Sequence, residues 1–221
     1  MDRSELLRHV DHTLLRPDAT AAEIRQLCDE ALKYNTASVC VPPSYVGTCA
    51  RYLQGRIKVC TVIGFPNGYN SLQIKVLETA EAIKNGADEI DLVINVGYVK
   101  DGQWGLVMDE ILAVKKECDK YKKLLKVIIE TCLLTDKEKE RMCRMVTQAK
   151  VDYIKTSTGF SSGGATREDV ALLVANVGAG VKVKASGGIS TLQDAEDFLA
   201  LGADRLGTSK VVKLIMAEEN K

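Results

Sequence analysis

The sequence predicts a single α/β domain, residues 1–221, folded as a closed (β/α)8 TIM barrel with a short N-terminal helix. Short β-branched runs alternate with amphipathic helical stretches along the chain, as expected for a parallel sheet covered by helices. Eight such units in 221 residues fit a barrel near its lower size limit. An open doubly wound sheet is the alternative, but neither Gly-x-Gly-x-x-Gly nor the Walker pattern, which are typical of it, occurs here.

The expected strands are runs of apolar and β-branched residues bounded by turn residues. Helical stretches separate them, so we expect a parallel sheet with the helices outside. The predicted strands are Asp11–Leu15, Ser38–Val41, Lys58–Phe65, Glu89–Asn95, Lys126–Thr131, Tyr153–Ser157, Val181–Ser186 and Arg205–Thr208.

The helices between these strands carry recognisable start and stop signals. Thr20-x-x-Glu23 and Thr135-x-x-Glu138 match the capping box, in which a hydroxyl and a carboxylate satisfy backbone amides at the helix start. Gly86 and Gly202 each end a helix, as a left-handed cap requires, and each is followed by Ala-Asp and a strand.

Composition argues against several classes of protein. The 30 basic and 30 acidic side chains cancel, so nucleic-acid binding is not expected as the main role. The chain starts with charged residues and no apolar run approaches the roughly 18 residues of a membrane span, so we expect a cytoplasmic protein without membrane contact. Seven cysteines without a Cys-x-x-Cys pair indicate reduced thiols. No Cys/His cluster has metal-ligand spacing, so no metal site is expected.

Alternation along the strands places charged residues inside the predicted barrel, because successive side chains face opposite ways. Isoleucine, leucine and valine residues occupy the alternate positions, which should contact the helices. The residues predicted to point inward are Asp91, Asn95, Lys126, Glu130, Lys155, Lys182 and Lys184, with Cys40 beside them. Lysines outnumber carboxylates in this set, so either solvent enters the barrel or one lysine stays uncharged.

Two of these lysines, Lys155 and Lys184, end apolar segments that precede small, glycine-rich turns. Burial disfavours the ammonium form of a lysine, and a second ammonium nearby disfavours it further. An uncharged lysine is an amine nucleophile for carbonyl groups. The pair therefore predicts an enzyme of carbonyl chemistry, and the alternative is a salt-bridge network that only organises the barrel.

Glycine-rich turns follow the last strands of the predicted barrel. Gly187-Gly188-Ile189 comes after the seventh strand, Gly207-Thr208-Ser209 ends the eighth, and Gly159 follows the sixth. Loops after strands seven and eight, together with a helix N-terminus, are where barrels bind phosphate through backbone amides. The turns predict a phosphate site, against the alternative that Gly187 and Gly188 only form a tight turn.

Several segments, in order along nearly the whole chain, resemble the deoxyribose-phosphate aldolase family. The segments that end in or contain Lys155 and Lys184 are the most specific of them. The matching segments are Asp11–Leu15, Ser38–Val41, Glu89–Asn95, Lys126–Thr131, Lys155–Phe160 and Val183–Gly188.

The resemblance implies a metal-free class I aldolase without a cofactor. Such an enzyme reversibly cleaves 2-deoxy-D-ribose 5-phosphate to D-glyceraldehyde 3-phosphate and acetaldehyde, a reaction of deoxyribonucleotide catabolism. By motif, Lys155 is the Schiff-base lysine, Asp91 a proton donor and acceptor, and Lys184 the second catalytic lysine that also tunes Lys155. The residues that the resemblance assigns to the substrate phosphate are Gly159, Gly187, Gly188, Gly207, Thr208 and Ser209. Those expected to line the pocket are Cys40, Asn95, Lys126 and Glu130.

The chain departs from the family pattern at a few positions. Arg16 stands where the family often has lysine and is expected to be a surface cation. Lys210 follows the Gly-Thr-Ser turn and either attracts phosphate or points to solvent. No tyrosine follows Tyr153, so we expect no contribution from a C-terminal tyrosine.

Two other functions are alternatives. The protein is either another Schiff-base aldolase, acting on a different sugar phosphate, or a non-catalytic sugar-phosphate binding protein. A homodimer is the expected oligomeric state. Sugar phosphates and aldehydes are the expected small-molecule partners in the catalytic case.

Overall fold

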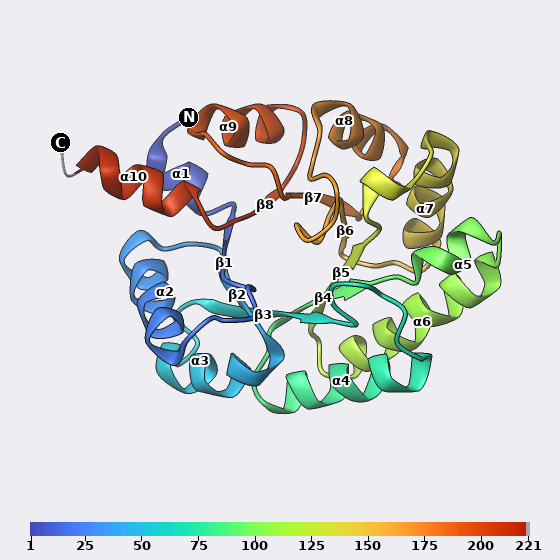
Figure 1. Cartoon of the computed structure of the whole chain (residues 1–221), viewed down its shortest axis with the longest axis horizontal. Helices are drawn as coiled ribbons and strands as arrows, with labels where there is room; N and C mark the ends of the chain where they lie inside the picture. Colours follow the sequence, from blue (N-terminus) through green and yellow to red (C-terminus); the bar gives the residue numbers. More distant parts are fainter. Residues whose placement is uncertain (220–221) are drawn as a thin grey trace.

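The computed structural model describes residues 1–219 and forms a closed barrel of parallel strands surrounded by helices (Figure 1). Each strand pairs with the next along the chain, and β1 closes the barrel by pairing with β8. The strands are β1 (Val10–Thr13), β2 (Ser38–Val41), β3 (Lys58–Ile63), β4 (Glu89–Val93), β5 (Leu124–Ile128), β6 (Tyr153–Lys155), β7 (Lys182–Ser186) and β8 (Arg205–Thr208).

The helices form the outer layer of the barrel. The predicted (β/α)8 barrel with a short N-terminal helix is thereby confirmed. The α-helices are α1 (Arg3–Leu7), α2 (Ala21–Tyr34), α3 (Val46–Leu53), α4 (Leu72–Lys84), α5 (Val96–Lys100), α6 (Trp104–Lys120), α7 (Asp136–Gln148), α8 (Arg167–Asn176), α9 (Leu192–Ala200) and α10 (Val211–Glu219). Two short 3-10 helices are η1 (Pro43–Tyr45) and η2 (Thr131–Leu133).

Strand bounds agree with prediction in part. Ser38–Val41 and Arg205–Thr208 are observed as predicted. The predicted extensions to Asn95 and Thr131 are wrong, because β4 ends at Val93 and β5 ends at Ile128. After β5 the backbone turns at Glu130, whose φ of 53° is left-handed and incompatible with a strand.

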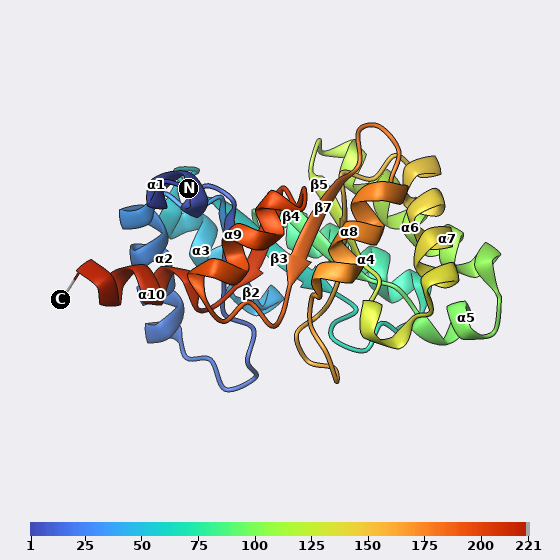
Figure 2. The ribbon, with the colours of Figure 1, turned by 90° about the horizontal axis from the view of Figure 1, so that it is seen from above.

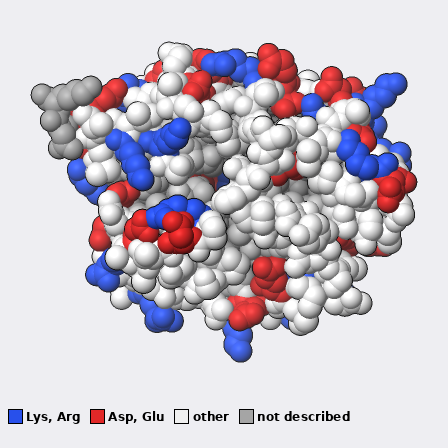
Figure 3. Space-filling view, viewed as in Figure 1, with Lys and Arg blue, Asp and Glu red and all other residues white. Residues whose placement is uncertain are grey.

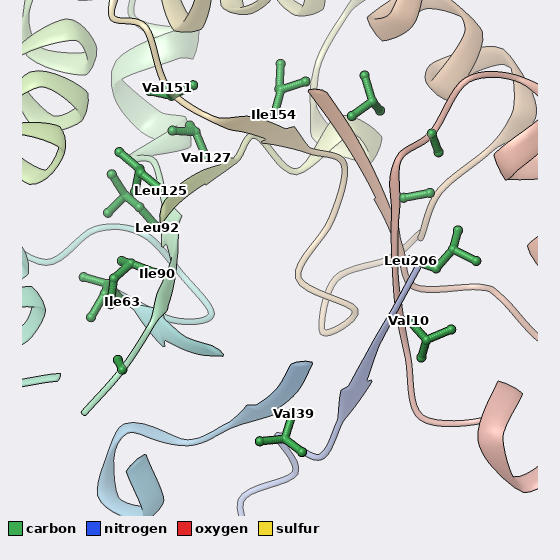
Figure 4. Packing of buried hydrophobic residues seen from close by; sticks show 14 of the residues in the cluster. Val10, Val39, Ile63, Ile90, Leu92, Leu125, Val127, Val151, Ile154 and Leu206 are labelled. Atoms are coloured by element: carbon green, nitrogen blue, oxygen red, sulfur yellow. The ribbon is translucent and has the colours of Figure 1, made fainter. Parts of the chain in front are cut away.

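The hydrophobic core lies between the outer face of the strands and the helices (Figure 4). Ile90, Leu92, Val127 and Ile154 belong to it and are fully buried, as the alternation pattern predicted. Burying one such side chain contributes about 1.5–3 kcal/mol. Because this outer shell supplies the apolar burial, the inner face of the barrel is free to carry polar groups.

The predicted helix caps are present. Thr20 and Thr135 each accept a hydrogen bond from the amide three residues on, and the glutamate at that position accepts one from the threonine amide. A third box at Thr191 and Asp194 has the shorter acid and was not predicted. Gly86 and Gly202 have φ of 106° and 103°, the left-handed form expected after α4 and α9.

Charged side chains of α4 and α6 anchor two loops at the carboxyl ends of the strands. Lys75 Nζ lies 2.8 Å from Glu110 Oε1, and both side chains are almost completely buried. Glu110 Oε2 accepts a hydrogen bond from the Asn95 amide at 3.0 Å, and Glu78 accepts one from the Gly64 amide at 2.8 Å. These contacts hold the loops that follow β3 and β4.

The loops after the strands share one side of the barrel. Figure 2 shows the β1–α2 loop and the β6–α8 loop extending from the same side of the molecule. Catalytic sites of barrels lie on this side, at the carboxyl ends of the strands. Within residues 1–219, no helix combines the length and apolar character needed to cross a membrane.

Gly68 offers a test of the loop packing. A Cβ atom there would lie 1.9 Å from the Ile94 carbonyl oxygen, whereas one on Gly55 would meet nothing within 4 Å; both glycines have positive φ. We expect Gly68→Ala to lower the free energy of unfolding by at least about 2 kcal/mol, since steric overlap adds to backbone strain. Gly55→Ala, the matched control, should show only the strain of roughly 1 kcal/mol. If urea unfolding gave the same loss of unfolding free energy for both variants, the close approach of residue 68 to the Ile94 carbonyl would be contradicted.

Candidate active site

Charged side chains fill the barrel interior, where barrels are usually packed with branched apolar residues. They come from β1 and from β4 to β8 and are buried, apart from a side-chain exposure of 13% for Arg205. This set, called the buried charge network below, consists of Asp11 (β1), Glu89 and Asp91 (β4), Lys126 (β5), Lys155 (β6), Lys184 (β7) and Arg205 (β8).

Asp91 is the centre of the buried charge network. Its Oδ2 accepts hydrogen bonds from Lys155 Nζ at 2.8 Å and from Lys184 Nζ at 2.7 Å. Its Oδ1 accepts from Lys126 Nζ at 2.8 Å and from Cys60 Sγ at 3.2 Å. One carboxylate therefore brings together the three lysines that β5, β6 and β7 contribute.

The remaining carboxylates neutralise the cations below Lys155. Lys184 Nζ lies 2.5 Å from Asp11 Oδ2, and Lys126 Nζ lies 2.6 Å from Glu89 Oε2. Arg205 contacts Asp11 at 2.6 Å and Glu89 at 3.1 Å. Each of these cations has two or more carboxylate partners. Within residues 1–219, Lys155 pairs with one carboxylate oxygen, Asp91 Oδ2, which Lys184 shares.

The contacts fix the charges of the central groups. Burial disfavours the ionised form of Asp91, but Lys126, Lys155 and Lys184 outweigh it and hold the pKa of Asp91 well below its usual value. Burial likewise disfavours the Lys184 ammonium, but Asp11 and Asp91 prevail and raise the pKa of Lys184. Lys184 is therefore a permanent cation close to the Lys155 nitrogen.

A pocket of about 400 Å³ opens directly above the network. Lys155 lines it, and among the described residues no other member of the buried charge network does. The six residues predicted to bind phosphate also line it: Gly159, Gly187, Gly188, Gly207, Thr208 and Ser209. The pocket thus joins an amine at its floor to glycine-rich turns at its side.

The glycines of the pocket have steric reasons to be glycine. Gly187 and Gly188 have φ of 73° and 75°, which other residues rarely adopt. A Cβ on Gly207 would lie 2.3 Å from the Ser186 hydroxyl oxygen. These turns place backbone close to the pocket, beside the start of α10.

Comparison with known proteins places this geometry in a family. The profile of the DeoC/LacD family aldolase matches residues 6–207.

The chain belongs to the DeoC/LacD family of aldolases.

Relatives in this family match the chain over nearly its full length. A deoxyribose-phosphate aldolase of Streptococcus pyogenes serotype M4 is 52% identical, over 100% of this chain and 98% of the relative. A solved structure from Coccidioides immitis is 38% identical with a TM-score of 0.94, covering 99% of this chain and 87% of the other. The tetrameric deoxyribose phosphate aldolase of Aeropyrum pernix is 32% identical with a TM-score of 0.91, covering 99% and 92%. The resemblance predicted from the sequence is confirmed.

One lysine was assigned wrongly to the interior of this aldolase barrel. Lys182 is exposed and pairs with Asp204 at 3.4 Å. It is the first residue of β7, at the end of the barrel opposite the pocket. Alternation gives the face of a strand but not the depth along it, and at its ends a long side chain reaches water.

The residues predicted to line the pocket lie beside or beneath it instead. Cys40 and Lys126 are fully buried under the pocket floor, and neither is among its lining residues. Glu130 also lies outside the lining: its carboxylate accepts hydrogen bonds from the Thr158 amide at 3.2 Å and the Thr158 hydroxyl at 2.5 Å. Burial raises the pKa of Glu130. Asn95 is half-buried after β4, outside the pocket lining as well.

Several residues of the site were not assigned to it from the sequence. Arg16 is a partly exposed cation, as expected, but it also lines the pocket, as does Lys213. Lys210 lines the pocket too, in agreement with the first of the two roles expected for it. Asp11 and Arg205 belong to the buried charge network, but neither was predicted to point into the barrel. Asp11 was noted only as part of a segment that resembles the family. The alternation rule could have found both, since each lies opposite an apolar residue, Val10 and Leu206.

Two groups of buried donor atoms in this family member resemble metal ligands by proximity alone. The sets Cys40, Cys60 and Asp91, and Asp11, Cys60 and Glu89, each have their donor atoms within 4.8 Å of one another. Lys126 Nζ already contacts Cys60 at 3.2 Å, Asp91 at 2.8 Å and Glu89 at 2.6 Å. The ammonium group thus occupies the position that a cation would take.

Thiol accessibility tests the placement of Cys40. Cys132 is exposed and the other six cysteines are buried, so an aromatic disulfide reagent should titrate about one fast thiol in the native protein and all seven after denaturation. Cys132→Ser should remove the fast phase and Cys40→Ser should leave it intact. A fast phase lost with Cys40→Ser would mean that this thiol faces the pocket.

Proposed function

We propose that the protein reversibly cleaves 2-deoxy-D-ribose 5-phosphate to D-glyceraldehyde 3-phosphate and acetaldehyde through a Schiff base on Lys155. The observation that carries the proposal is the position of the Lys155 nitrogen. It contacts Asp91 in the buried charge network and also lines the pocket that holds the glycine-rich turns. Family membership and relatives with this activity support the same reaction.

The reaction begins when the uncharged amine of Lys155 adds to the C1 aldehyde of the open-chain sugar. Loss of water from the carbinolamine gives an iminium cation. The C2–C3 bond then breaks as the C3 hydroxyl loses its proton, and the bonding electrons flow into the iminium as an enamine. D-Glyceraldehyde 3-phosphate leaves, the enamine carbon takes up a proton, and hydrolysis releases acetaldehyde and the free lysine.

Lys184 and Asp91 have separate roles in this scheme. The Lys184 ammonium favours the uncharged form of Lys155, because two ammonium groups close to one carboxylate oxygen repel each other. Asp91 accepts hydrogen bonds from both nitrogens. It is therefore placed to take and return protons during carbinolamine dehydration and at the enamine carbon.

The wall of the pocket suits a phosphate group. Backbone amides at glycine-rich turns and at the start of α10 provide donors, as in other phosphate-binding barrels. Arg16, Lys210 and Lys213 add positive charge to this wall. Figure 3 shows Lys and Arg side chains beside the central hollow on the side of α10. A sugar with a phosphate at the end far from its aldehyde can therefore span from these groups to Lys155.

Three further assignments stay predictions. We propose that residues 1–221 act as one domain and that the enzyme works in the cytoplasm. The homodimer also stays a prediction, and the Aeropyrum pernix relative is tetrameric.

Covalent trapping tests the role of Lys155. Acetaldehyde with cyanoborohydride should add one reduced ethyl group, located on Lys155 by peptide mass spectrometry, because the reductant captures the iminium. Lys155→Ala should lose the adduct and the turnover of 2-deoxyribose 5-phosphate. Lys182→Ala, the matched control on the exposed end of β7, should retain both. Modification of Lys184 in place of Lys155 would reverse the assignment.

Charge reversal tests the phosphate site. Ser209→Glu should raise the KM for 2-deoxyribose 5-phosphate at least about tenfold, since a repulsion of about 1.4 kcal/mol suffices for that change. Turnover of unphosphorylated 2-deoxyribose should change little. Ser161→Glu, at an exposed position outside the pocket lining, serves as the matched control. An unchanged KM for the phosphorylated sugar would place the phosphate elsewhere.

A further inference from the structure

We propose that the opposite charges of Arg205 and Glu89, which offset each other in their ion pair, each influence the pH range in which Lys155 is uncharged and reactive. This inference rests on the proposed Schiff-base role of Lys155 and goes beyond it. Neither Arg205 nor Glu89 lines the pocket, so both act on the reaction through other residues. They are positioning residues, whose charges act on Lys155 through the other members of the buried charge network.

The pair lies at the end of the barrel away from the pocket. Glu89 is the first residue of β4 and Arg205 the first residue of β8. The Arg205 guanidinium contacts Glu89 Oε2 at 3.1 Å and lies 5.5 Å from the centre of the Tyr153 ring. Reagents that enter through the pocket therefore do not touch it.

The pair is connected to Lys155 through a continuous series of ionic contacts. Glu89 contacts Lys126 at 2.6 Å, Lys126 contacts Asp91 at 2.8 Å, and Asp91 contacts Lys155 at 2.8 Å. A second series runs from Arg205 through Asp11 and Lys184 to the same Asp91 oxygen. In register, Lys155 pairs with Lys184, and Lys184 pairs with Arg205. With strands about 4.8 Å apart, the Cα atoms of Lys155 and Arg205 are about 10 Å apart.

Charge balance explains why this pair matters. Without Lys155, the network contains the carboxylates of Asp11, Glu89 and Asp91 and the cations Lys126, Lys184 and Arg205. Their charges cancel, so a proton on Lys155 gives the buried interior a net positive charge. An unbalanced charge in a low-dielectric interior is unfavourable. The uncharged amine of Lys155 is thus the form that the network favours.

The other ionisable groups around Lys155 leave this balance in place near neutral pH. Lys126, Lys155 and Lys184 hold the pKa of Asp91 well below its usual value. Burial raises the pKa of the Cys60 thiol, which stays protonated. The remaining ionisable groups that face the site are Cys40 from β2, Tyr153 from β6, Glu130 after β5, and the pocket-wall cations Arg16, Lys210 and Lys213. The variants below keep all of these unchanged.

Removing Arg205 and removing Glu89 should shift the pH profile of adduct formation in opposite directions. Arg205→Met removes a positive charge, stabilises the Lys155 ammonium and should move the midpoint of adduct formation to higher pH. Glu89→Gln removes a negative charge and should move the midpoint to lower pH. Each shift should be about one pH unit, the effect of one charge about 10 Å away at an effective dielectric constant of about 20.

The measurement is the rate of reduced adduct formation on Lys155 with acetaldehyde and cyanoborohydride, followed by mass spectrometry across the pH range in which circular dichroism shows a folded protein. Acetaldehyde lacks phosphate, so the phosphate site does not enter. Arg205→Lys keeps the charge and should keep the midpoint. The double variant Arg205→Met/Glu89→Gln restores the balance and should return the midpoint to that of the unaltered protein.

The outcomes separate this inference from the proposed function. Absence of any adduct on Lys155 in the unaltered protein would overturn the function itself. An adduct with shifts in the same direction, or without shifts, would overturn the role of the pair and leave the function standing. If Arg205→Met does not fold, the nearly isosteric Glu89→Gln decides alone: a midpoint at lower pH supports the inference and an unchanged midpoint refutes it.

Discussion

The carboxylate of Asp91 is the interaction on which the site depends. Its two oxygens receive four hydrogen bonds, from Lys155, Lys184, Lys126 and Cys60. Burying a carboxylate in this way is unfavourable unless cations and hydrogen-bond donors surround it. Here the surrounding groups come from strands β3, β5, β6 and β7. Asp91 therefore obtains all of its hydrogen-bond partners only when the barrel closes. The consequence is that two lysines are held close enough to influence each other, although each alone would prefer water.

The rest of the fold makes such an interior possible. The apolar core lies outside the strands, where fully buried side chains such as Ile90 and Leu92 contact helices. That shell supplies hydrophobic stabilisation. In most barrels, apolar side chains inside the barrel contribute to this stabilisation as well. The buried pair of Lys75 and Glu110 then holds the Asn95 amide after β4. The pocket itself lies among the loops that follow β1, β6, β7 and β8, with Lys155 at its floor.

Much of this arrangement is legible in the sequence because it depends on local patterns. Alternation identified Asp91, Lys126, Lys155 and Lys184 as inward-facing, and the Gly-Gly and Gly-Thr-Ser turns located the pocket wall. The sequence could not give the depth of a residue within the barrel, and Lys182 was misplaced for that reason. Nor could it show that Arg205, the first residue of its strand, contacts Asp11 and Glu89, which lie 194 and 116 positions away. Such pairings depend on tertiary register, which a single strand does not encode.

The division between the buried charge network and the open pocket has a mechanistic meaning. Lys155 is the member of the buried charge network that lines the pocket among the described residues, so it alone of that network can meet a substrate. The permanent charges beneath it sit in fixed positions before substrate arrives, and they need no reorganisation when an iminium cation forms. Asp91 then faces a positive charge on the same nitrogen that it contacted before the reaction. The carboxylate that contacts the Lys155 nitrogen in the structure would therefore also lie beside the cationic intermediate of the proposed reaction.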